Sequence, residues 1–328
     1  MIRELQGEAW VRLIAKLDRL PHALLLHGAP GVGKHPLAER FAQLLLCEKR
    51  GQGTEPCGAC EGCHWFLGGN HPDVRYLEPE AIARQVVPVE EEGGEESSKT
   101  ARKPSLQIRI EQTRALANFI NLGSHRGGRR VAVIHPAEDM NQATANSLLK
   151  SLEEPPPAAV FVLVSHRPAR LLPTIRSRCV PVPVPLPEPR AAASWLEEQG
   201  VRDAARWLAF AGGAPYRALE YAAGERGAAI ERVVHAIASG DLGALGDVKD
   251  REGLEPLAEV LQKLALDRAF GALTGRAKYS MAAGKTAAGN ARAWLAYARA
   301  MGRNRLLVRH PLNPKLFAAD MVAAMPKI

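Results

Sequence analysis

Residues 28–35, GAPGVGKH, nearly match the loop that grips the phosphates of a nucleoside triphosphate. That loop reads G-x-x-x-x-G-K-[ST], in which backbone amides and the lysine contact phosphate and the final hydroxyl binds Mg²⁺. Gly28, Gly33 and Lys34 agree with the pattern, whereas His35 stands where the hydroxyl is required. An imidazole is a poor substitute for a hard oxygen ligand. The sequence therefore predicts a degenerate phosphate loop, with ATP binding weak or absent.

A second departure affects the other metal-binding position of such a site. In phosphate-loop ATPases a buried strand ends in an acidic residue that holds Mg²⁺. Here the strand-like run VAVI, residues 131–134, is followed by His135 and Pro136, and the acidic residues Glu138 and Asp139 come only later. Because both Mg²⁺ positions are altered, we expect a nucleotide-binding fold without intrinsic ATP hydrolysis.

Four of the five cysteines crowd into one short segment that contains C-x₂-C-x₂-C. The four are Cys47, Cys57, Cys60 and Cys63. Four thiolates can enclose Zn²⁺ tetrahedrally and leave no open position, which is typical of a structural site. Unligated thiols and an iron–sulfur cluster are the alternatives, and His64 and His71 are nearby but less favoured ligands. We therefore expect a structural Zn²⁺ bound by the four cysteines.

Strand and helix signals alternate around these residues. Short apolar runs predict strands at 23–28, 71–79, 131–134 and 158–165. Helical spacing predicts helices at 34–46, 110–123 and 141–156, with Asn141 as a cap, and a short helix within 167–179. Strands that alternate with helices favour an α/β fold with a parallel, doubly wound sheet.

Five alternating prolines from Pro181 to Pro189 enforce an extended backbone and predict a domain boundary. Beyond them only helical patterns follow, so the C-terminal half is predicted to be all-helical. The polar stretch 90–105 contains five glutamates in its first seven positions and predicts a solvated loop.

Composition indicates a globular protein outside the membrane. Hydrophobic residues make up 46% and charged residues 24% of 328 residues. No apolar run approaches the ~18–20 residues that span a bilayer, and the charged N-terminus resembles an amphipathic helix rather than a signal peptide. We therefore expect a cytoplasmic protein. The net charge is +8, and the region 268–328 holds eleven Lys/Arg against one acidic residue, which is compatible with a nucleic-acid contact or with a solvated basic face.

Several motifs together resemble one protein family. HALLLHGAPGVGK, the four-cysteine spacing, NSLLKSLEEPP and TIRSRC occur in this order between about residues 20 and 180. They resemble the delta-prime family of DNA polymerase III clamp-loader subunits, which are AAA+ proteins. The resemblance implies an AAA+ phosphate-loop domain over 1–186 with an inserted zinc module at 47–63, a small helical lid domain over 187–225, and a helical oligomerisation collar over 226–328.

The resemblance also implies a function in DNA replication. In this family five subunits form an open ring, and each ATP site combines the phosphate loop of one subunit with the arginine of an SRC motif from the next. The matching residues are Ser177, Arg178 and Cys179, so Arg178 is expected to act as an arginine finger in trans. Ser165 and Arg217 match the family's sensor positions. The implied role is a non-catalytic stator whose partners are the gamma/tau ATPase subunits and the delta subunit, and indirectly the sliding clamp and primer–template DNA.

Two other functions remain open from the residues alone. One is an active ATPase that tolerates His35 and uses Glu138 or Asp139 as its metal-binding carboxylate. The other is a zinc-containing DNA-binding protein that uses the basic C-terminal helices, for which salt-sensitive DNA binding would be diagnostic.

Overall fold

The computed structural model describes residues 2–51, 53–83, 104–122, 124, 128–241, 243, 245, 248, 251–279, 290–308 and 310–326. The chain divides into two compact units, Met1–Leu186 and Pro187–Ile328. The acidic segment 90–103, predicted as a loop, lies outside the described residues. The division of the second unit into a lid and a collar stays a prediction.

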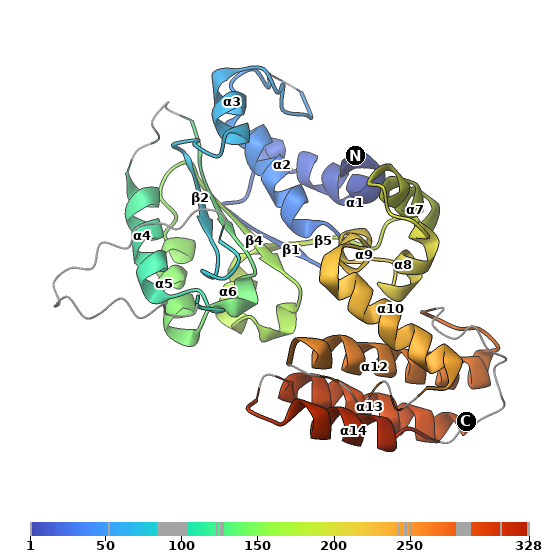
Figure 1. Ribbon diagram of the computed structural model, residues 1–328. Helices are drawn as coiled ribbons and strands as arrows, with labels where there is room; N and C mark the ends of the chain where they lie inside the picture. Colours follow the sequence, from blue (N-terminus) through green and yellow to red (C-terminus); the bar gives the residue numbers. More distant parts are fainter. Residues whose placement is uncertain are drawn as a thin grey trace. The chain divides into compact units, whose positions relative to one another are not determined.

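The first unit is built on a five-stranded parallel sheet with the order β2-β3-β4-β1-β5 (Figure 1). Its strands are β1 (Ala23–His27), β2 (Val74–Leu77), β3 (Arg130–Ile134), β4 (Ala159–Ser165) and β5 (Val180–Pro183). Its helices are α1 (Ile2–Ile14), α2 (Lys34–Leu46), α3 (Glu61–Leu67), α4 (Ile110–Asn121), α5 (Gln142–Glu153) and α6 (Pro173–Arg178). The predicted parallel α/β fold is confirmed.

Helices cover both faces of the sheet. On one face α4, α5 and α6 pack on alternate strand residues, among them Leu25, Ile134 and Phe161. On the other face α2 crosses β1, β3 and β4 and is itself packed by α1, whose Trp10 ring meets Phe41 of α2 edge-on. Because both faces are buried, the central strands are almost continuously apolar, as the sequence indicated. Polar residues that could bind a ligand are therefore expected in the loops at the carboxyl ends of the strands.

The proline-rich segment is part of the sheet as well as the boundary between the units. Residues Val180–Pro183 form β5 and pair in parallel with β1. The sequence predicted an extended backbone here but no fifth strand. Pro181 and Pro183 lack an N–H donor, and an edge strand tolerates this because one of its sides needs no ladder hydrogen bonds.

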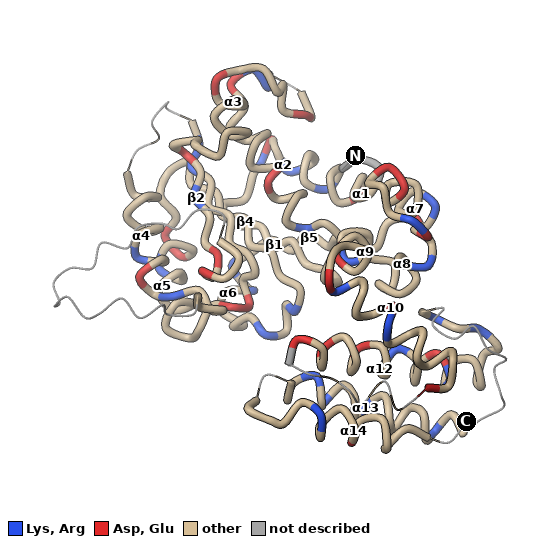
Figure 2. The backbone as a smooth tube through the Cα atoms, in the orientation of Figure 1, with Lys and Arg blue, Asp and Glu red and all other residues tan. Residues whose placement is uncertain are grey.

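The second unit is helical throughout the residues that the structure describes, as predicted. Its helices are α7 (Pro189–Glu198), α8 (Ala204–Phe210), α9 (Pro215–Ala222), α10 (Gly224–Ser239), α12 (Arg251–Thr274), α13 (Ala291–Leu307) and α14 (Pro314–Ala323). Leu257 and Leu261 of α12 pack with Trp294 and Met301 of α13 in the core of this unit. The basic excess is visible on α13, which carries arginines and no acidic residue (Figure 2).

A buried carboxylate connects four helices of the second unit. The side chain of Glu259 of α12 is 1% exposed and accepts a hydrogen bond from the Tyr221 hydroxyl of α9. Four cations surround it: Arg217 of α9 at 3.0 Å, Arg226 of α10 at 3.2 Å, Lys263 of α12 at 2.9 Å and Arg305 of α13 at 3.7 Å. Burial raises the pKa of Glu259, but Lys263 and Arg305 outweigh burial and bring the pKa down to about 2. The carboxylate is therefore ionised near neutral pH.

Among the helices in the described part of the chain, none is long and apolar enough to cross a membrane.

Candidate functional site

The loop between β1 and α2 keeps the backbone form of a phosphate loop. Gly28 lies against the end of β5, where an added Cβ would come 2.3 Å from the carbonyl oxygen of Val184. Gly33 has φ of 92° and stands just before α2, in the left-handed region that favours glycine. The glycines that the sequence singled out are therefore required by the close approach and the turn of this loop.

The lysine of the loop binds its own loop. Lys34 is 2% exposed, and its Nζ donates to the carbonyl oxygens of Gly28 at 2.9 Å and Ala29 at 2.6 Å. Burial lowers the pKa of Lys34 to about 8, although Glu138 raises it. From the other side, Nε2 of Gln6 donates to the carbonyl oxygen of Val32 at 2.6 Å. The donor that would meet phosphate is thus already bonded within the chain.

The two histidines predicted to stand at the Mg²⁺ positions, His35 and His135, meet at one carboxylate. His35 is the second residue of α2, His135 follows β3, and Glu78 follows the neighbouring strand β2. Nε2 of His35 lies 3.2 Å and Nδ1 of His135 lies 3.8 Å from Oε1 of Glu78. The two imidazole rings stack, with 4.4 Å between centroids and 29° between planes. Burial raises the pKa of Glu78, but His135 and His35 lower it to about 2.

The acidic residues beyond β3 have other positions. Oε1 of Glu138 accepts the backbone N–H of His166 at 2.9 Å. Neither Glu138 nor Asp139 belongs to the His35–Glu78–His135 group. Ser165, at the end of β4, is fully buried, and its Oγ accepts the N–H of Arg167 at 3.2 Å. The Ser165 contact is local along the chain, whereas Glu138 and His166 are 28 residues apart and meet where β3 and β4 end.

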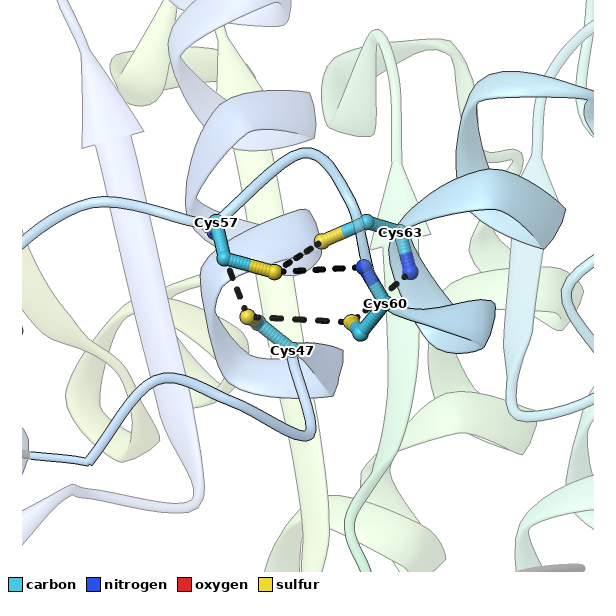
Figure 3. Close-up of side chains that lie close together, drawn as sticks. All are labelled: Cys47, Cys57, Cys60 and Cys63. Carbon is cyan, nitrogen blue, oxygen red and sulfur yellow. Dashed lines mark hydrogen bonds between the residues drawn. The ribbon is translucent and has the colours of Figure 1, made fainter.

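The four clustered cysteines converge at the start of α3 (Figure 3). Sγ of Cys47 lies 4.0 Å from Sγ of Cys60, and Sγ of Cys57 lies 3.9 Å from Sγ of Cys63. All four sulfurs lie within 4.8 Å of one another. In a tetrahedral site with Zn–S bonds of about 2.3 Å, sulfurs stand about 3.8 Å apart. The spacing therefore matches a four-thiolate zinc site.

Backbone amides point at the same sulfurs. Sγ of Cys57 accepts the N–H groups of Ala59 at 3.4 Å and Cys60 at 3.3 Å, and Sγ of Cys60 accepts that of Cys63 at 3.4 Å. The N–H of Ala59 is the main cause that lowers the pKa of Cys57, whereas burial raises the pKa of Cys63 to about 12. Amide donors favour thiolates, the form that binds metal. Gly62 has no room for a side chain, because an added Cβ would lie 2.8 Å from the carbonyl oxygen of Leu46.

Arg178 lies at the end of α6, with its side chain 34% exposed. Its Nη1 donates to the carbonyl oxygen of Thr174 at 2.9 Å, and its Nη2 lies 2.6 Å from Oε1 of Glu153 at the end of α5. Ser177 bonds Thr174 locally, and Cys179 is buried in the core of the first unit. Arg217, the other arginine singled out, is bound to Glu259 in the second unit.

The sequence did not single out two carboxylates that contact the predicted site residues. They are Glu78, beside His35 and His135, and Glu153, beside Arg178. Glu78 was read only as part of a strand segment, although a charged residue directly after a buried parallel strand is a usable signal. Glu153 lies within the motif NSLLKSLEEPP, but its pairing with Arg178 depends on how α5 and α6 pack.

Comparisons with known proteins include a DNA polymerase III family model and several delta' subunits. The model of a family described as DNA polymerase III, delta subunit, matches residues 6–187. The DNA polymerase III subunit delta' of Pseudomonas aeruginosa is 41% identical over 217 residues, 65% of this chain and 59% of that protein. The delta' subunit of Yersinia pestis is 39% identical over 158 residues, 48% of this chain and 40% of that protein.

The match to the delta' subunit of Escherichia coli K12 is longer, at 32% identity over 262 residues, 76% of this chain and 71% of that protein. The matched segments of the Pseudomonas and Yersinia relatives span less than two thirds of those proteins.

Proposed function

This chain belongs to the family of DNA polymerase III delta' subunits, and we therefore propose that it is a non-catalytic AAA+ subunit of a clamp loader. In that role it helps to place a sliding clamp on primed DNA during replication in the cytoplasm. Its partners are gamma/tau ATPase subunits and a delta subunit. Its second unit supplies the lid over 187–225 and the collar over 226–328.

The observation that carries the non-catalytic role is an asymmetry within the first unit. The chain's own nucleotide position holds His35 and His135 in place of oxygen ligands, and Lys34 is bonded to its own loop. Arg178 remains partly exposed at the end of α6. A chain of this kind cannot complete its own ATP site but can contribute an arginine to a neighbour's.

The contact with Glu153 is compatible with such a use of Arg178. A partly exposed ion pair of this kind is worth about 0–1 kcal/mol. The guanidinium can therefore leave Glu153 for the phosphoryl group of a neighbouring subunit at little cost, and its planar donors suit that anion.

The assembly itself is tested by reconstitution. The tagged 328-residue chain, mixed with gamma/tau and delta subunits, is expected to elute with both of them in one complex on size-exclusion chromatography. Elution of the chain apart from both subunits, under conditions where they assemble with another delta' subunit, contradicts the proposal.

We also propose that the four cysteines hold a structural Zn²⁺. The purified protein is expected to contain about one Zn²⁺ that survives dialysis without chelator, because four thiolates complete the coordination shell. Inductively coupled plasma mass spectrometry gives the metal content. Cys60→Ser is expected to lose most of this zinc and to loosen the segment 47–63 in hydrogen exchange, while the sheet keeps its protection.

Cys179→Ser is the matched control for this zinc site. Cys179 is a buried cysteine of the same unit that lies outside the cluster, so its replacement is expected to leave the zinc content unchanged. Zinc-free protein after purification without chelators, or equal loss from both variants, argues against the assignment.

The isolated protein is expected to show no ATP hydrolysis above background, because both Mg²⁺ positions lack oxygen ligands. Phosphate release at saturating Mg-ATP measures this. A turnover that Lys34→Ala abolishes would revive the alternative of an active ATPase.

A further inference from the structure

The nucleotide position of the first unit contains a second group of possible metal ligands, separate from the four cysteines. The group consists of His35, Glu78 and His135, and one ligand atom from each lies within 4.8 Å of the other two. The three residues come from three segments at the carboxyl ends of β1, β2 and β3, which is the edge where parallel sheets bind ligands. None of the three has a role in the function proposed above beyond the loss of Mg²⁺ binding.

The imidazole nitrogens that face the carboxylate are unsatisfied. Within the described chain, Nε2 of His35 and Nδ1 of His135 are buried and have no hydrogen-bond partner, even though both approach Oε1 of Glu78. The side chain of Glu78 is only 4% exposed. A ligand that contacts both nitrogens and the carboxylate at once would satisfy all three of these buried groups.

Two imidazoles and a carboxylate are a donor set for Zn²⁺ and similar divalent transition metals, not for Mg²⁺. With bonds of about 2.0–2.1 Å, the ligand atoms of a tetrahedral zinc site stand about 3.3 Å apart. The separations of 3.2 and 3.8 Å from Glu78 are close to that value. The widest separation among the three ligand atoms is at most 4.8 Å. The stacked rings already present their nitrogens to the same oxygen.

We propose that His35, Glu78 and His135 form a second metal site that binds Zn²⁺ through three protein ligands and leaves a fourth position for water. A metal there connects α2 to the ends of β2 and β3, at the place where an active relative would hold its Mg-nucleotide. A bound metal would thus stabilise the degenerate phosphate loop, residues 28–35, as a structural element. The site depends on these three side chains alone, so the test needs no partner subunit and is independent of the clamp-loader role.

The experiment adds Zn²⁺ to the 328-residue protein. Bound metal is measured after gel filtration, and heat release is measured by calorimetry. The expected result is about two bound equivalents, one in the four-cysteine site and one in the new site. Glu78→Gln and His135→Ala are each expected to bind the second equivalent at least about 10-fold more weakly, since even the loss of an outer-shell partner has effects of 10- to 100-fold. Both variants should keep the first equivalent.

His166→Ala is the matched control. The His166 ring lies edge-on to that of His135, with 5.4 Å between centroids, and its Nδ1 is also buried, but it is not one of the three ligands. Its replacement is expected to leave both equivalents bound.

Co²⁺ added to protein that already carries one zinc equivalent gives a second readout. Visible bands without thiolate charge transfer are expected in the wild type and absent in Glu78→Gln. A wild type that binds only one equivalent, or variants that bind the second as tightly as the wild type, overturns the proposal.

Discussion

Arg178→Ala is expected to lower DNA-stimulated ATP turnover and clamp loading by the reconstituted complex while assembly stays intact. Trans-acting arginines contribute about 10³- to 10⁵-fold in GTPases, because the guanidinium neutralises charge that develops on the phosphoryl group. The interface served by Arg178 should lose a factor in that range. The fall for the whole complex is smaller, since other interfaces of the ring carry their own arginines. Single-turnover ATP hydrolysis and clamp loading on primed DNA measure the effect.

Arg176→Ala is the matched control for Arg178. Arg176 is an exposed arginine on the same short helix α6, so this variant has the same loss of charge and should load clamps at the normal rate. Arg178→Lys should rescue only partly, because an ammonium lacks the planar set of donors. Glu153→Gln should leave turnover intact, since it only removes the resting partner of Arg178. Normal loading by an assembled Arg178→Ala complex means that Arg178 is an ordinary surface cation.

The second large effect is expected on stability, at the buried carboxylate of the second unit. Glu259→Gln leaves four cations around a neutral amide, and the buried Lys263 loses its partner at 2.9 Å. Removal of one member of a buried ion pair costs about 3–5 kcal/mol because the remaining charge stays desolvated. We expect the free energy of unfolding of the second unit to fall by about that amount. Urea denaturation, together with hydrogen exchange of the α12 amides, measures the loss.

Glu220→Gln controls for a simple loss of charge. Glu220 pairs with Arg226 at 3.1 Å but its side chain is 61% exposed, so its removal should cost only about 0–1 kcal/mol. Equal destabilisation by both variants would mean that the burial of Glu259 is not what makes it important.

The effect of Glu259 should also depend on pH with a defined sign. Its pKa of about 2 in the folded chain lies below the usual 4.5. Its contribution to stability is therefore fully present above about pH 4.5 and is lost as the pH falls toward 2. The difference in unfolding free energy between wild type and Glu259→Gln is expected to shrink across that window. A difference that stays constant through it contradicts the assignment of the low pKa to Glu259.

The sequence by itself determined the features that depend on local pattern. The α/β alternation, the form of the phosphate loop, the capping of α5 by Asn141 and the helical second half follow from short-range periodicity and turn chemistry, and the structure confirms them. The four-cysteine cluster was also predictable, since three of its members lie within seven residues and the fourth needs only a short loop to reach them. The absence of oxygen ligands at the two Mg²⁺ positions stays a prediction from the sequence.

Only the tertiary structure decided what the changed residues contact. Residues 35, 78 and 135 are far apart in the chain, and they meet because β2 lies next to β3 and α2 begins beside them. Glu153 meets Arg178 because α5 packs against α6. Glu259 meets its four cations because four helices of the second unit pack around it. The order of strands in the sheet and the packing of helices set these contacts. Both depend on burial summed over the whole core, which no local spacing of residues encodes.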